Sequence, residues 1–142
     1  MTLYLDTSSI VKLYVDEPAR EDVRRLLTDA SVVVTSQVAY PEARSAFARR
    51  RREGALSAAA HQNAKNDFET DWSMFAKIET TATLCSEAGH LAERYALHGF
   101  DAIHLASFAE MLRALRGTDD VEFSSFDDRL NSAARRLARS IQ

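Results

Sequence analysis

Cysteine, proline and glycine are all scarce in this chain, and each scarcity excludes something. The single cysteine, Cys85, excludes an internal disulfide and a cysteine-based zinc cluster. Only four glycines and two prolines occur in 142 residues, which argues against a disordered or low-complexity chain and favours helices with short connections. Since Cys85 falls within an amphipathic pattern, we expect it to be a small core residue of a helix.

Long apolar runs and a strong excess of one charge are also missing. No apolar stretch approaches the roughly 20 residues that span a bilayer, so we expect no membrane segment. The charge of Asp6 interrupts the first short apolar run, which argues against a secretory signal and, with the lone cysteine, favours the cytoplasm. A formal net charge of −3 does not indicate a strongly basic nucleic-acid binder, although a basic surface can coexist with clustered acids.

What is present is typical of an ordinary globular protein. Hydrophobic residues make up 46% of the chain and charged residues 27%, which predicts one domain over residues 1–142. Short apolar or β-branched runs predict strands at 3–5, 31–35 and 121–123, with a weaker candidate at 76–79. Helical spacing predicts helices at 8–15, from Pro18 to about 27, and at 36–52, 56–72, 84–95, 101–112 and 127–137. This alternation predicts an α/β fold with a short parallel sheet between two layers of helices, in an undetermined strand order.

Four acidic residues occupy positions from which they can meet at one edge of such a sheet. Asp6 directly follows the first strand, and Asp127 comes shortly after the last. Glu42 lies early in the helix after the second strand, and Asp101 begins a helix entered from the opposite side. Ligands of open α/β sheets bind beyond the carboxyl ends of the strands. Carboxylates gathered there repel one another unless a cation compensates, and hard oxygen ligands suit Mg²⁺ or Mn²⁺.

Taken singly, each of these acids also has a simpler explanation. Asp6 and Asp101 could cap helices, Asp127 could be a favourable charge in a first helical turn, and Glu42 could be solvated. The assignment of the fourth acid could shift by one residue, because Asp128 follows Asp127 directly. Asp119 and Asp120 are also candidates for the fourth acid. They precede the last strand, however, so in a parallel sheet they lie at the opposite end from the other acids.

The sequence around the four acids resembles the PIN-domain family, and within it the VapC-type toxins of bacterial VapBC toxin–antitoxin pairs. The matching segments, in chain order, are LYLDTSSIVKLY at 3–14, SQVAYPE at 36–42, HGFDAIHLA at 98–106 and FSSFDDRL at 123–130. The first and third are fairly specific, and together the segments extend over essentially the whole chain.

The resemblance implies a three-layer α/β/α fold and an endoribonuclease that uses Mg²⁺ or Mn²⁺ to leave a 5′-phosphate and a 3′-hydroxyl. It implies that Asp6, Glu42 and Asp101 coordinate metal directly or through water, and that Asp127 completes the acidic pocket. Ser125 matches the small hydroxyl residue two positions before the last acid, and Ser9 matches, more loosely, a residue that orients Asp6. The implied partners are an RNA substrate, a VapB-like antitoxin and a second copy of the chain in a homodimer.

Two further features have both a functional and a structural explanation. The run Arg49, Arg50, Arg51 and Arg52 could contact RNA phosphates, or could form a solvated face at a favourable helix end. A helix points four consecutive side chains all around its axis, which favours the second explanation for individual arginines. His104 lies one helical turn after Asp101, so it could face the acids or be a packed structural histidine.

Two other functions compete with the nuclease. A phosphatase of the haloacid-dehalogenase type needs a second Asp where this chain has Ser8, and a receiver domain needs paired acids that are absent from the first strand. A catalytically silent PIN-like module could bind RNA or protein without cleaving it. Retention of four mutually repelling acids argues against that module, because a binder gains nothing from the repulsion.

Overall fold

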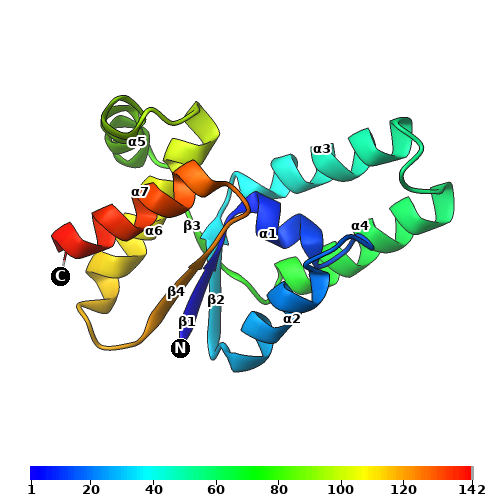
Figure 1. The fold of residues 1–142 in the computed structure, drawn as a ribbon, viewed down its shortest axis with the longest axis horizontal. Coiled ribbons are helices and arrows are strands. Elements are labelled where there is room, and N and C mark those ends of the chain that lie inside the picture. The colour runs from blue at the N-terminus through cyan, green and yellow to red at the C-terminus, as the bar shows by residue number, and fades with distance from the viewer. Residues whose placement is uncertain (142) are drawn as a thin grey trace.

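Four parallel strands form the centre of the molecule in a computed structural model that describes residues 1–141 (Figure 1). The strand order is β3-β2-β1-β4, and all three pairings are parallel. The strands are β1 (Thr2–Leu5), β2 (Val32–Ser36), β3 (Ala76–Ile78) and β4 (Val121–Ser124). The predicted parallel sheet is confirmed, including its weakest strand, and β1 lies inside the sheet between β2 and β4.

Seven helices of the described residues cover the two faces of this sheet. They are α1 (Thr7–Lys12), α2 (Arg20–Asp29), α3 (Ala39–Arg52), α4 (Ala58–Trp72), α5 (Ala82–Tyr95), α6 (Gly99–Leu115) and α7 (Asp128–Ile141). Helices α5, α6 and α7 lie on one face, and α1 to α4 lie on the other, where α3 and α4 project from the sheet as a long hairpin (Figure 1). No helix of residues 1–141 is long and apolar enough to cross a membrane.

The apolar run of β1 contributes to both halves of the core. Successive side chains of a strand point to opposite faces, so Tyr4 packs with α5, α6 and α7, whereas Leu3 and Leu5 pack with α1, α3 and α4. All three side chains are fully buried. A strand covered on both faces has no need of polar alternation, which explains the continuous apolar run. Because β1 is central, the residue that follows it lies in the middle of the carboxyl edge of the sheet.

Helix α3 begins at Ala39, three residues after the predicted start of this helix at 36. The β-branched run continues as strand through Ser36, whose backbone pairs with β3 and whose buried hydroxyl accepts a hydrogen bond from the Val38 amide at 3.2 Å. The predicted end of the helix is confirmed: α3 stops at Arg52, and Gly54 follows with a φ of +79° that favours glycine.

The expectation that Cys85 is a core residue is wrong. Its side chain is exposed on α5, whose buried positions are Leu84, Ala88, Leu91 and Tyr95. Cys85 directly follows one of these core positions and therefore points away from them. The apolar face of α5 was predicted correctly. The sequence did not show whether Cys85, a small residue next to that face, points into the core or into solvent.

Candidate active site

Asp6 lies where β1 ends, and hydrogen bonds fix both of its carboxylate oxygens. Its Oδ1 caps α1 by accepting from the Ser9 amide at 3.0 Å and also accepts from the Ser8 hydroxyl at 2.7 Å. Its Oδ2 accepts from the Ser125 hydroxyl at 2.6 Å, across the β1–β4 pair. The residue is only 3% exposed. Donors on α1 and in the connection after β4 therefore compensate for the burial of this charge and set its orientation.

Glu42 lies in the first turn of α3 and points back toward the end of β1. Its Oε1 accepts hydrogen bonds from the Thr7 hydroxyl at 2.5 Å and from His104 Nε2 at 3.0 Å. Burial alone would raise the pKa of Glu42, but these two hydrogen bonds outweigh it and hold the pKa below its ordinary value. The carboxylate is thus kept ionised and fixed through one oxygen.

The orientation of Glu42 depends on a buried hydrogen-bond chain that runs through His104 to the core. His104 is 1% exposed, and its Nδ1 lies 2.9 Å from the Tyr4 hydroxyl. Its Nε2 lies 2.9 Å from the Thr7 hydroxyl, which itself donates to Glu42. All these contacts are satisfied when Tyr4 donates to Nδ1 and the Nε2 proton points at Glu42 and Thr7. Tyr4 therefore selects the tautomer of His104 that donates to Glu42.

Asp101 faces the same edge from the first turn of α6. Its carboxylate accepts no hydrogen bond from the residues that the structure describes, and it is half-buried. Burial raises the pKa of Asp101, and the charges of Asp127, Asp6 and Glu42 raise it further against an opposing effect of His104. The other three acids named from the sequence are therefore close enough to Asp101 for their charges to act on it.

Asp127 is the half-buried member of the adjacent pair and caps α7. Its Oδ1 accepts from the Leu130 amide at 2.8 Å, and its own amide donates to the Ser125 hydroxyl at 3.0 Å. Asp128 is exposed as the first residue of α7. Asp119 lies at the opposite edge of the sheet, where the Thr2 hydroxyl donates to it at 2.5 Å. The structure thus brings Asp127 to the other three acids and keeps Asp119 away from them.

The oxygen donors of this site fit a hard divalent cation held mainly through water. Within residues 1–141, no group of three His, Cys, Asp or Glu side chains is arranged closely enough to hold a metal ion directly. Mg²⁺ does not require such a group, because it usually keeps several waters and binds only one or two carboxylates. Burial and, after it, the charges of neighbouring acids raise the pKa of Asp101, and a bound cation would offset both effects.

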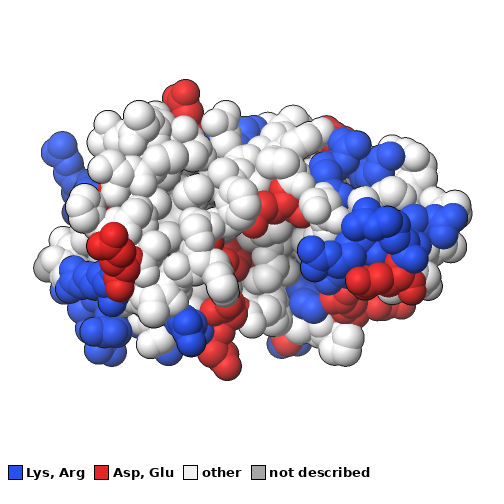
Figure 2. Space-filling view, turned by 90° about the horizontal axis from the view of Figure 1, so that it is seen from above, with Lys and Arg blue, Asp and Glu red and all other residues white. Residues whose placement is uncertain are grey.

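The predicted arginine run divides into residues with different partners. Arg50 is half-buried, and its Nε donates to Glu17 at 2.7 Å, so its role is structural. Arg49 is exposed and lines a cavity that also includes Glu42 and Thr7. Arg51 and Arg52 are exposed at the end of α3. Figure 2 looks down on this edge of the sheet and shows acidic side chains near the middle, with basic side chains gathered over the projecting α3–α4 hairpin.

The supporting hydroxyls differ in part from those expected. Ser125 contacts Asp6, whereas Ser9 contacts it through the backbone amide and uses its hydroxyl on Ser124 at 2.8 Å. The hydroxyl that reaches Asp6 from α1 belongs to Ser8. Sequence reasoning did not assign roles to Ser8 or to Thr7. The cluster of hydroxyl residues directly after Asp6 was a usable signal, since a buried carboxylate needs nearby donors.

Comparison with known proteins gives consistent matches to one family. The PIN domain family model matches residues 3–136. Ribonuclease VapC49 of Mycobacterium tuberculosis is 38% identical to this chain over 105 residues, which cover 74% of this chain and 73% of VapC49. Ribonuclease VapC46 of the same organism is 30% identical over 139 residues, which cover 98% of this chain and 95% of VapC46.

A solved structure has the same fold. The crystal structure of VapC20 from Mycobacterium tuberculosis, a toxin that cleaves the sarcin–ricin loop, matches with a TM-score of 0.64. The match covers 92% of this chain and 94% of VapC20 at 19% sequence identity. At that identity the likeness concerns the fold, and it agrees with the three-layer arrangement predicted from the sequence.

Proposed function

Because this chain belongs to the PIN-domain family, we propose that it is an endoribonuclease that acts as the toxin of a type II toxin–antitoxin module. The observation that carries the proposal is the meeting of Asp6, Glu42, Asp101 and Asp127 at the carboxyl edge of the sheet, where burial and the charges of the other three acids raise the pKa of Asp101. The relatives named as VapC ribonucleases support the same activity.

We propose that Mg²⁺ or Mn²⁺ is the cofactor, held by Asp6, Glu42 and Asp101 directly or through water, with Asp127 completing the pocket. When bound, such a cation lowers the pKa of a water and stabilises the charge that develops on the phosphate. The water oxygen bonds to phosphorus, the bond between phosphorus and the 3′ oxygen breaks, and that oxygen takes a proton. The products are a 5′-phosphate and a 3′-hydroxyl.

The protein's own contribution to this reaction is to hold the carboxylates in fixed positions. Ser8 and Ser125 donate to different oxygens of Asp6, so its carboxylate cannot rotate freely. His104 and Thr7 restrain one oxygen of Glu42. Such preorganisation reduces the rearrangement that is needed when charge develops during the reaction.

The partners follow from the same family membership. We propose that a VapB-like antitoxin inhibits the enzyme, that the active form is a homodimer, and that it works in the cytoplasm, where RNA is its substrate. We also propose that the chain functions as a single nuclease domain.

The first experiment is to incubate the purified, antitoxin-free protein with total cellular RNA, with and without Mg²⁺ or Mn²⁺. Asp6→Asn and Asp101→Asn should lower the cleavage rate by more than the about 10- to 100-fold that follows loss of a residue that only orients a ligand. Both variants should stay folded, because asparagine keeps the shape of the side chain.

Asp128→Asn is the matched control, since it removes an exposed carboxylate next to Asp127. It should cleave RNA at the wild-type rate. We expect the wild type and Asp128→Asn to produce discrete metal-dependent fragments, and the other two variants to produce none. Full activity of Asp6→Asn or Asp101→Asn would refute the assignment of the site. Absence of both cleavage and metal binding in the wild type would instead favour a silent binding module.

A further inference from the structure

Two phenylalanine rings remain exposed beside the acidic site in a chain that packs its other phenylalanines. Of the seven phenylalanines, only Phe100 and Phe126 are exposed among the described residues, with exposed fractions of 58% and 45%. Phe100 directly precedes Asp101, and Phe126 directly precedes Asp127. Leaving such large apolar side chains exposed forgoes the stability that their burial would give, so their position at the acids points to contact with a ligand.

Phe100 is the ring with open space around it. It lines a cavity of about 640 Å³ between α5 and the start of α6, together with Cys85 and Ala92, and we call this the α5–α6 cavity. It also lines a cavity of about 510 Å³ on α3 that extends to Arg49, which we call the α3 cavity. Glu42 borders both cavities. By contrast, the Lys12 ammonium lies 5.3 Å from the ring centre of Phe126 and occupies one of its faces.

The two cavities differ in chemistry in a way that matches one strand of RNA. The α5–α6 cavity is walled mainly by small and apolar side chains, including Ala88, Gly89 and Ile103. The α3 cavity has the cation of Arg49 at its far end. Proteins that bind single strands combine cations for the phosphates with aromatic rings on which bases stack. Unpaired bases in loops are also what proteins contact when they recognise RNA by sequence.

We propose that the ring of Phe100 stacks on an unpaired base of the RNA substrate, next to the phosphodiester held at the acids, and that the α5–α6 cavity receives this base. The strand then continues through the α3 cavity toward Arg49. This inference rests on the proposed ribonuclease activity and assigns a base-binding subsite to it. The single-stranded region of the substrate is accordingly recognised at this site through the π-face of a base as well as through its phosphates.

The test compares RNA strands that have equal charge but differ in their bases. Every protein carries Asp6→Asn to prevent cleavage, and the probes are an oligouridylate and a ribose-phosphate strand of the same length without bases. The Asp6→Asn protein should bind the oligouridylate more tightly than the base-free strand. Adding Phe100→Leu should reduce this preference by about 5- to 150-fold, the range that loss of one stacked base produces.

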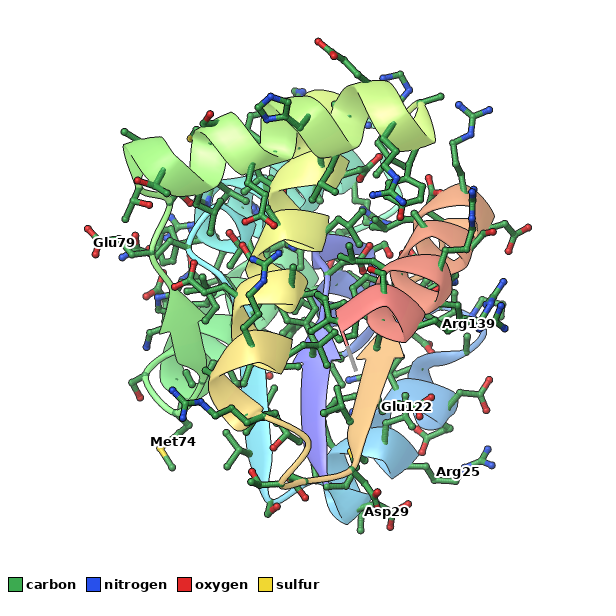
Figure 3. The ribbon with its side chains drawn as sticks, turned by 90° about the vertical axis from the view of Figure 1, so that its left-hand side faces the viewer. Arg25, Asp29, Met74, Glu79, Glu122 and Arg139 are labelled. Carbon is green, nitrogen blue, oxygen red and sulfur yellow. The ribbon has the colours of Figure 1, made fainter. Side chains whose placement is uncertain are left out.

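Two further variants test whether the effect needs an aromatic ring at position 100 and whether loss of any exposed apolar side chain produces it. Phe100→Tyr keeps an aromatic ring and should retain the preference. Met74→Ala removes a side chain that is 80% exposed at the end of the sheet opposite the acids (Figure 3), and it should bind both strands as the parent protein does. The dependence of affinity on salt should be equal in all variants, because none of them loses a phosphate contact.

Three results would overturn the subsite. The first is a parent protein that shows no preference for the base-bearing strand, and the second is an unchanged preference after Phe100→Leu. The third is a loss of the preference in Phe100→Leu that accompanies a shift from dimer to monomer, seen by light scattering, because the ring would then belong to a contact between copies. If the wild type cleaves RNA while any of these holds, the ribonuclease proposal stands and only the subsite fails.

Discussion

At the scale of single residues, the site depends on side chains that never need to touch the substrate. His104 is buried between Tyr4 and Glu42, and it donates to Glu42 only while its Nε2 carries the proton. Outer residues of this kind fix the orientation of the groups that do contact a metal or substrate. A histidine in this position is therefore both a packed core residue and a positioning residue, which joins the two explanations that the sequence left open.

Replacing His104 with alanine should impair the site more than its fold. We expect His104→Ala to lower the cleavage rate about 10- to 100-fold and to weaken Mn²⁺ binding, because Glu42 loses one of its two donors. His104→Gln should recover part of both losses, since the glutamine amide nitrogen can occupy the place of Nε2. Single-turnover cleavage and the Mn²⁺ dependence of the melting temperature measure the two effects.

Tyr4→Phe is the control for this prediction. It removes the hydroxyl that selects the tautomer but leaves the donor to Glu42, so its losses should be smaller than those of His104→Ala. If His104→Ala melts at a lower temperature yet cleaves RNA and binds Mn²⁺ as the wild type does, His104 is only a core residue.

At the scale of elements, α3 connects the acidic site to the basic surface. Glu42 lies in its first turn, and the arginine run fills its last turn. Arg50 is fixed to Glu17, whose carboxylate also pairs with Lys12 of α1. The hydrogen bond from Arg50, with help from Lys12, holds the pKa of Glu17 below its ordinary value. One arginine of the run thus attaches α3 to the α1–α2 connection, and its neighbours remain available to a ligand.

Arg49→Gln and Arg50→Gln remove the same charge from adjacent positions and should have different effects. Arg49→Gln should weaken binding of single-stranded RNA and lower the slope of log affinity against log salt by about 0.7, the value for one phosphate contact. Arg50→Gln should lower the melting temperature and leave that slope unchanged. Binding titrations at several salt concentrations measure the slope. Equal slopes for Arg49→Gln and the wild type would remove Arg49 from the RNA path.

At the scale of the whole molecule, the fold holds acids from four separate segments close together against their mutual repulsion. The first and last of these follow neighbouring strands, and the other two begin helices on opposite faces of the sheet. In the unfolded chain these charges are far apart, so folding without a cation costs free energy. A metal ion that binds only the folded state should therefore increase the stability of the protein.

Thermal melting should therefore reveal the metal site without any RNA. Mn²⁺ at about a hundred times its Kd should stabilise the wild type by about 2.7 kcal/mol, as mass action requires. Asp101→Asn should melt at a higher temperature than the wild type in the absence of metal and respond less to Mn²⁺. No response of the wild type to millimolar Mn²⁺ would contradict the proposed cofactor.

The increase in stability that Asp101→Asn gives to the metal-free protein should depend on pH. The pKa of Asp101 is raised by burial and by its acidic neighbours, so the ionised form costs stability above that pKa. Below the ordinary aspartate pKa of about 3.9, the group is protonated in both the folded and the unfolded state, and the cost disappears. The increase in stability should therefore be complete at neutral pH and vanish in acid. Melting temperatures of the variant and the wild type across this pH range measure it.

The sequence by itself determined the alternation of strands and helices and the family, and it predicted the four acids of the site. These follow from local patterns: the apolar run before Asp6 shows where a buried strand ends, and the position of Asp127 just beyond the last strand indicates the same edge. Periodicity and turn residues act over a few positions, so they can be recognised in one stretch of chain. For the same reason, the start of α3 and the outward direction of Cys85 were predicted less well.

Only the tertiary structure decided how the site is assembled. The strand order, the contact of the Ser9 hydroxyl with Ser124 rather than with Asp6, and the chain from Tyr4 through His104 to Glu42 all depend on residues far apart in sequence. The exposure of Phe100 is of the same kind, because nothing in its neighbours distinguishes it from the phenylalanines of the core. Whether a side chain is buried, bonded or exposed depends on which distant segments pack against it, and packing in three dimensions settles that after the local structure is formed.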